Sequence, residues 1–215
     1  MLKHHFTLLY RDLTKGKFLT ALTILGLSLG MTCFILLTQF VLYEHSYDKF
    51  HEHEERIFRL KTTIYEGSHP KLSIAQSPYP LAHALKENIP EIVEIVRIRR
   101  TEDYIISNNQ ISFNAKGIQA DSSFFDVFSY KLKSGSVSEA LNNPNSIVIS
   151  EDLSRKVFGS TDPIGSSITV SYRHFKEDYI VTGILENIPH NSHLEFEFVL
   201  SLNIQEVNYY WFNHI

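Results

Sequence analysis

The chain has 215 residues, of which 43% are hydrophobic, and a formal net charge of −4 at pH 7. This length allows one membrane anchor and one outer domain of moderate size, and the hydrophobic content allows a packed core. Basic residues beyond position 17 are scattered and form no patch with interleaved aromatic residues, so nucleic acid is excluded as an expected partner.

Residues 1–17 form the first segment, a short basic stretch with apolar residues at helical spacing. This pattern predicts an amphipathic helix on the cytoplasmic membrane face, with a frayed basic tail as the alternative. We expect four of its side chains to contact a cytoplasmic partner. They are Phe6, Leu9, Arg11 and Leu13.

Residues 18–43 contain no charged residue. A helix of this length spans about 39 Å, more than the hydrocarbon core of a bilayer, which is about 30 Å thick. The run is too long for the apolar part of a signal peptide, and no small-residue cleavage site follows it. We therefore predict a permanent transmembrane helix.

The charges that flank this segment predict its orientation. Lysine and arginine residues precede it, whereas glutamate and aspartate residues dominate residues 44–55. Basic flanks stay in the cytoplasm, so we expect the N-terminus inside the cell and the residues after 43 outside it.

Gly26 and Gly30 form a GxxxG pair inside the segment. This spacing removes side chains from one helix face and allows a second helix to approach closely. The alternative is that glycine is simply common in membrane helices. If the glycine pair does pack against a second helix, that helix belongs to another chain or to a part of this protein outside the sequence.

Residues 44–215 alternate irregularly between helix-like and strand-like stretches with several hairpin turns. This pattern predicts an α+β fold, a mixed α/β domain of two lobes. Helices are expected at 44–56 (a polar stalk that continues the membrane helix), between Pro80 and Pro90, and at 122–128, 136–141 and 151–158. Strands are expected at 57–65, 72–76, 93–99, 104–107, 111–114, 117–120, 147–149, 168–172, 179–185 and 195–200. The pair Asn108-Asn109 is expected to form the turn of a hairpin between 104–107 and 111–114.

Three further expectations concern single residues of this domain. Asp121 is expected to cap the helix at 122–128, whose phenylalanines we assign to the core. Ser150 is expected to cap the helix at 151–158, and Gly159 to end it.

No catalytic or metal-binding motif is found in the sequence. It has no Walker A loop, no GxSxG turn and no HExxH pair, and its single cysteine, Cys33, lies within the predicted membrane helix. The densest group of possible metal ligands is His45, His51 and His53 with their neighbouring glutamates, which we interpret as a solvated face of the stalk. We therefore expect no enzyme activity, no cofactor and no metal on this chain.

Ten short runs, in order along the chain, resemble one family. They are Tyr47–His51, Arg56–Leu60, Pro80–Ala82 with Leu85, Pro90–Ile92, Ala120–Phe128, Ser146–Glu151, Lys156–Gly159, Asp162–Gly165, Gly183–Leu185 and Pro189–Leu194. Each run is weak alone, but the ordered set resembles the N-terminal part of MacB-like, FtsX-like ABC transporter permeases, in the style of the Bacteroidetes.

This resemblance implies a permease in the bacterial inner membrane, with residues 44–215 as a MacB-like periplasmic core domain. It implies a homodimer or heterodimer of permeases and a partner ATPase subunit that binds ATP and drives export or efflux through periplasmic movement. Family members have three further membrane helices, so we expect the domain to be incomplete at residue 215. The alternative is a single-pass, membrane-anchored periplasmic binding or sensor domain.

Overall fold

The computed structural model describes residues 16–108, 111–173 and 175–202. The chain divides into two compact units, residues 1–47 and 48–215. The predicted amphipathic helix lies outside the described residues, except for its last two positions.

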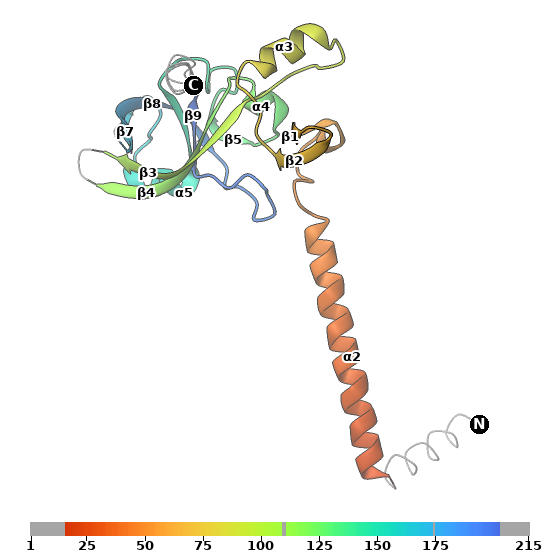
Figure 1. The fold of residues 1–215 in the computed structure, drawn as a ribbon. Helices are drawn as coiled ribbons and strands as arrows, with labels where there is room; N and C mark the ends of the chain where they lie inside the picture. Colours follow the sequence, from red (N-terminus) through yellow and green to blue (C-terminus); the bar gives the residue numbers. More distant parts are fainter. Residues whose placement is uncertain (1–15, 109–110, 174, 203–215) are drawn as a thin grey trace. The chain divides into compact units, whose positions relative to one another are not determined.

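The first unit contains one long helix, α2 (Lys17–Glu44), which corresponds to the predicted membrane segment (Figure 1). None of its side chains is buried, and it is the only helix in the described part of the chain that is long and apolar enough to cross a membrane. Its hydroxyl groups bond to carbonyls one turn back, for example Thr23 to Leu19 at 2.9 Å and Thr32 to Ser28 at 2.8 Å. Such bonds let a helix carry polar side chains in lipid.

The predicted stalk helix over residues 44–56 is wrong. The helix ends at Glu44, and turns lead to a single 3₁₀ turn, η1 (Glu54–Arg56). Asp48 has a left-handed backbone with φ 56°, which an α-helix does not accommodate. Its N–H donates to the carbonyl of Asn191 instead of to a helical carbonyl.

The second unit, as far as the structure describes it, holds two sheets beside its helices, so the predicted α+β class is confirmed. The smaller sheet is the antiparallel hairpin of β1 (Thr62–Glu66) and β2 (His69–Ile74). The larger one contains β3 (Ile98–Ser107), β4 (Ser112–Ala120), β5 (Leu132–Gly135), β6 (Ser146–Ser150), β7 (Ser167–Tyr172), β8 (Phe175–Leu185) and β9 (Phe198–Ser201). The division of this region into two lobes stays a prediction.

The larger sheet closes on itself. Its strand order is β5-β8-β6-β9-β4-β3-β7, and β7 also pairs with β8, so the strands from β8 to β7 form a ring (Figure 1). The long strand β8 makes this closure possible, because residues 175–180 pair with β7 whereas residues 180–185 pair with β6. The hairpin predicted around Asn108 is confirmed as the antiparallel pair of β3 and β4.

Alternate residues of the central strands point to opposite faces of the sheet and belong to two separate hydrophobic cores. Ile147 and Ile149 belong to a cluster with side chains from every strand of the ring, so this cluster fills the inside. Val148, between them, belongs to a second cluster on the outer face with Phe124 and Phe125. Both faces of β6 are therefore buried, which explains its uninterrupted apolar sequence.

In the described part of the second unit, three α-helices accompany the sheets: α3 (Leu81–Asn88), α4 (Phe124–Val127) and α5 (Glu151–Phe158). The Ser150 side chain accepts from the Leu153 N–H at 3.2 Å, and the helix ends at Gly159 with φ 65°, as predicted. Leu153 and Val157 of α5 join the core inside the ring.

Two local predictions are wrong. Asp121 does not cap a helix, because its carboxylate accepts from the backbone N–H of Arg97 at 2.8 Å and pairs with the Arg97 guanidinium at 2.7 Å. Residues 136–141 form turns instead of a helix, since Glu139 and Ala140 bond to carbonyls three residues back.

Candidate functional site

Gly26 and Gly30, the predicted helix-packing pair, lie on the exposed surface of α2. A methyl group added at either position would meet no atom of the described residues within 4 Å, apart from the helix's own backbone and chain neighbours. Their role in packing stays a prediction. The four residues predicted to contact a cytoplasmic partner, Phe6, Leu9, Arg11 and Leu13, lie outside the described residues.

The site that the structure itself brings together is the segment Asp48–Glu52, which we call the anchor segment. Its first and fourth residues follow the end of α2 at Glu44 by four and seven positions. The segment is bound at two points of the second unit, described in turn below.

The first attachment point joins Asp48 to the β8–β9 loop, residues 186–197. The Asp48 N–H donates to the Asn191 carbonyl at 2.9 Å. The Asp48 carboxylate accepts from the His193 N–H at 3.0 Å and lies 2.8 Å from His193 Nδ1. The loop therefore holds both the backbone and the side chain of one residue.

The second attachment point joins His51 to residues 128–130. His51 is 5% exposed, and its Nδ1 accepts from the Ser129 N–H at 3.1 Å. The N–H of Glu52 donates in turn to Ser129 Oγ at 2.9 Å. The prediction of a solvated histidine face is therefore wrong for His51, since the chain turns at Asp48 and directs this ring into the domain.

Aromatic rings surround His51. Ring centroids lie 4.1 Å away for Phe50, 5.2 Å for Phe128 and 5.1 Å for Tyr130. Burial lowers the pKa of His51, against the opposing effect of the carboxylates of Asp48 and Glu54. The neutral imidazole is thus the form that fits this site.

Tyr130 ties the two attachment points together. Its hydroxyl lies 3.0 Å from Ser192 Oγ, and Ser192 precedes His193 in the β8–β9 loop. Burial raises the pKa of Tyr130 to about 12, despite the hydrogen bond with Ser192, which lowers it. The ring packed against His51 is therefore also bonded to the loop that holds Asp48.

An open groove of about 570 Å³ lies beside the same loop. Its walls combine β4 with the two ends of the loop, whereas the middle of the loop binds the anchor segment. The lining residues are Asn114, Ala115, Lys116, Ile188, Pro189, His190, Glu195, Phe196 and Glu197.

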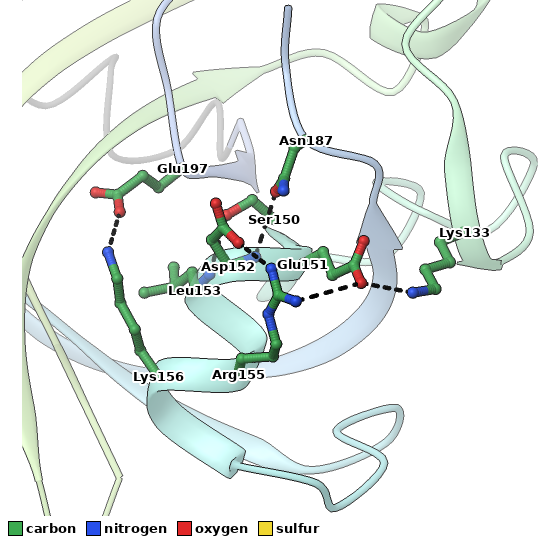
Figure 2. Close-up of polar contacts among 9 residues, drawn as sticks. All are labelled: Lys133, Ser150, Glu151, Asp152, Leu153, Arg155, Lys156, Asn187 and Glu197. Atoms are coloured by element: carbon green, nitrogen blue, oxygen red, sulfur yellow. Dashed lines mark hydrogen bonds and ion pairs between the residues drawn. The ribbon is translucent and has the colours of Figure 1, made fainter.

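A second group of polar residues surrounds the start of α5 (Figure 2). Glu151 pairs with Lys133 of β5 at 2.6 Å, and this hydrogen bond is the main reason that its pKa is lowered. Lys156 pairs with Glu197 at 3.1 Å. Each of these cations is about half exposed, so the pairs position α5 against its neighbours and contribute little stability.

The side chains of Asp48, Phe50 and His51 in the anchor segment are packed or hydrogen-bonded within the domain. The described residues contain no group of histidine, cysteine and carboxylate side chains able to hold a metal ion. The two runs that meet at the first attachment point, Tyr47–His51 and Pro189–Leu194, are visible in the sequence. The contact between these two runs cannot be read from the sequence, because the runs lie far apart in the chain and meet only when the strands close into a ring.

The sequence matches the family described as the MacB-like periplasmic core domain over residues 20–212. A search of curated proteins found no match.

Three solved structures are similar to the chain. A domain of a putative permease protein from Porphyromonas gingivalis has 24% identity and a TM-score of 0.56, covering 66% of this chain and 61% of that one. The extracellular domain of the noncanonical ABC-type transporter YknZ from Gram-positive bacteria has 17% identity and a TM-score of 0.46, covering 60% and 64%. The periplasmic region of MacB from Actinobacillus actinomycetemcomitans has 18% identity and a TM-score of 0.41, covering 56% and 52%. The chain thus spans less than two thirds of each.

Proposed function

Because this chain belongs to the MacB-like periplasmic core domain family, a component of transporter permeases, we propose that it works in the permease subunit of an ABC transporter. In this proposal α2 crosses the inner membrane with its N-terminus in the cytoplasm, and the second unit lies in the periplasm. A partner ATPase subunit binds and hydrolyses ATP, and the chain itself catalyses no reaction.

The observation that carries the proposal is the two-point attachment of the anchor segment. A chain that leaves a membrane helix through free turns would absorb helix movement in its own rotations. Here the Asp48 and His51 side chains are fixed to the domain within seven residues of the helix end. In this proposal the short connection between the helix end and the fixed side chains limits how far the helix can move without moving the domain.

We propose that this movement drives export or efflux, with the permease acting as a homodimer or heterodimer. The GxxxG face of Gly26 and Gly30 supplies a contact between membrane helices in such a dimer. ATP hydrolysis on the partner then changes helix positions, and the anchor segment transmits the change to the periplasmic domain.

A reporter on the domain tests this proposal. The full permease with its ATPase is placed in nanodiscs, and a fluorophore is attached at Glu139→Cys, an exposed position, in a Cys33→Ser background. We expect ATP to change the fluorescence of this protein. The double variant Asp48→Ala/His51→Ala should lose most of the change while the ATPase rate persists.

The matched control is Arg155→Ala, which removes a cation whose partners are Glu151 and Asp152 on the same helix, α5. It should leave the response intact. An unchanged response in the double variant would show that the anchor segment does not transmit the movement.

The groove beside the β8–β9 loop favours a second candidate, a membrane-anchored periplasmic binding or sensor domain. Its volume of about 570 Å³ is within the range of small-ligand sites. This alternative requires no ATPase. Failure of the full-length protein to associate with any ATPase in its native membrane, together with ligand binding in the groove, would favour it over the transporter.

A further inference from the structure

His51 can accept the hydrogen bond from Ser129 only in its neutral form. The donor is a backbone N–H at 3.1 Å from Nδ1, so this ring nitrogen must present a lone pair. Protonation would place a second N–H against the N–H of Ser129. The bond would then be lost, and two donors would face each other.

Among the described residues, no side chain accepts a hydrogen bond from the His51 ring. Phe50, Phe128 and Tyr130 pack against it, and its exposed fraction is 5%. A buried imidazolium without a partner is strongly disfavoured, so the ring leaves the site when it takes up a proton.

The charged and titratable groups around His51 are few. On its own segment, Asp48 and Glu54 favour the charged form, but burial outweighs them. On the opposite side, Tyr130 stays neutral at physiological pH because its pKa is about 12. From the β8–β9 loop, His193 contacts the anchor segment at Asp48. Its N–H and its Nδ1 both lie against the Asp48 carboxylate.

The first attachment point does not depend on a ring nitrogen that must accept. The backbone N–H of His193 donates to the Asp48 carboxylate at 3.0 Å, and this bond does not involve the imidazole. The first attachment point therefore survives in acid, whereas the second does not.

We propose that His51 is an acid-sensitive release, whose protonation frees the second attachment point and leaves the anchor segment held only through Asp48. A rigid two-point attachment becomes a one-point hinge. Release itself depends only on the geometry around His51, while its consequence for transport rests on the proposed coupling role of the anchor segment.

The test uses the full chain alone in nanodiscs, so it is independent of any ATPase. Histidine labelled with ¹⁵N reports the protonation of His51 Nδ1, and hydrogen exchange reports the protection of the Ser129 amide, corrected for its intrinsic rate. Between about pH 7.5 and about pH 5.0 we expect this protection to fall about tenfold or more as Nδ1 becomes protonated.

Two variants sharpen the result. His51→Gln keeps a side-chain acceptor that does not titrate, so its Ser129 protection should stay constant over the same range. His193→Gln, the matched control, should lose protection as the wild type does. Constant protection in the wild type, or an equal fall in His51→Gln, would overturn the proposal.

The wild type alone is decisive if His51→Gln does not fold. The pH midpoint of Nδ1 protonation must then coincide with the midpoint for loss of Ser129 protection. Separate midpoints would overturn the release. None of these outcomes bears on the transporter proposal, which the ATP-dependent reporter tests.

Discussion

Asp48 and His193 hold each other through two contacts although 145 residues separate them: the His193 N–H donates to one carboxylate oxygen at 3.0 Å, and His193 Nδ1 lies 2.8 Å from the other. This pair fixes the first residue of the anchor segment to the loop between β8 and β9. The left-handed backbone of Asp48, with φ 56°, sets the direction in which the chain enters the domain. The following predictions test this arrangement and the fold that supports it.

Asp48→Ala should destabilise the second unit by about 1–2 kcal/mol, because it removes the acceptor of two hydrogen bonds and places alanine in a left-handed backbone. Asp48→Asn is the control, since asparagine tolerates this backbone and keeps one acceptor oxygen. It should cost less than Asp48→Ala. Chemical unfolding of the full chain, followed by circular dichroism, measures both, and equal losses would contradict the backbone argument.

Gly117→Ala should destabilise the domain by about 1–3 kcal/mol through overpacking. Gly117 pairs with Phe198 across β4 and β9, and an added Cβ would overlap the fully buried Phe198 ring. Because the clash is with one side chain, the double variant Gly117→Ala/Phe198→Leu should lose less stability than the two single variants together. An additive result in thermal unfolding would show that the ring is not the cause.

The raised pKa of Tyr130 predicts that the free energy of unfolding falls in alkali. Its pKa is about 12 in the folded protein against an ordinary value of 10.0, so the unfolded chain loses its proton first as the pH rises. The stability that Tyr130 contributes is therefore complete below pH 10.0 and is lost between 10.0 and about 12. The difference between these two pKa values corresponds to a loss of at most about 2.7 kcal/mol.

Melting temperatures of the wild type and Tyr130→Phe across this range measure that loss. The variant lacks the titrating hydroxyl and should show a flatter decline. Parallel curves for the two proteins would contradict the assignment.

Gly26→Leu/Gly30→Leu should reduce close packing of α2 with a partner helix, because leucine fills the face that glycine leaves open. Cys33 lies three positions beyond Gly30, so oxidative cross-linking at Cys33 between copies in native membranes reports this packing. The control Ile35→Ala changes the opposite face of the helix, because it lies nine positions beyond Gly26. Unchanged cross-linking in the glycine variant, with the control also unchanged, would remove the packing claim.

The sequence correctly predicts those elements that are determined by residues within or next to the element itself. The apolar run of α2 sets a helix by itself, and Ser150 and Gly159 mark both ends of α5 by direct backbone effects. The turn at Asn108 similarly predicts its hairpin. In each case the residues that determine the structure lie within one element.

The remaining features depend on contacts between distant residues. Asp121 resembles a helix cap, but Arg97 takes its carboxylate once β3 and β4 pair. His51 resembles part of a solvated acidic face in the sequence. In the fold it is buried, because the Ser129 N–H donates to its ring and aromatic side chains pack around it. The closure of the ring through β7 and β8 brings together the partners of the anchor segment, and no single stretch of sequence contains that information.

The most direct test of the central claim is a pair of cryo-electron microscopy structures of the permease with its ATPase, at neutral pH, with and without ATP. Our account predicts that the domain changes position between the two states while Asp48 stays bonded to His193 and His51 to Ser129 in both. A domain that stays in place while these contacts break in one state would contradict transmission through the anchor segment.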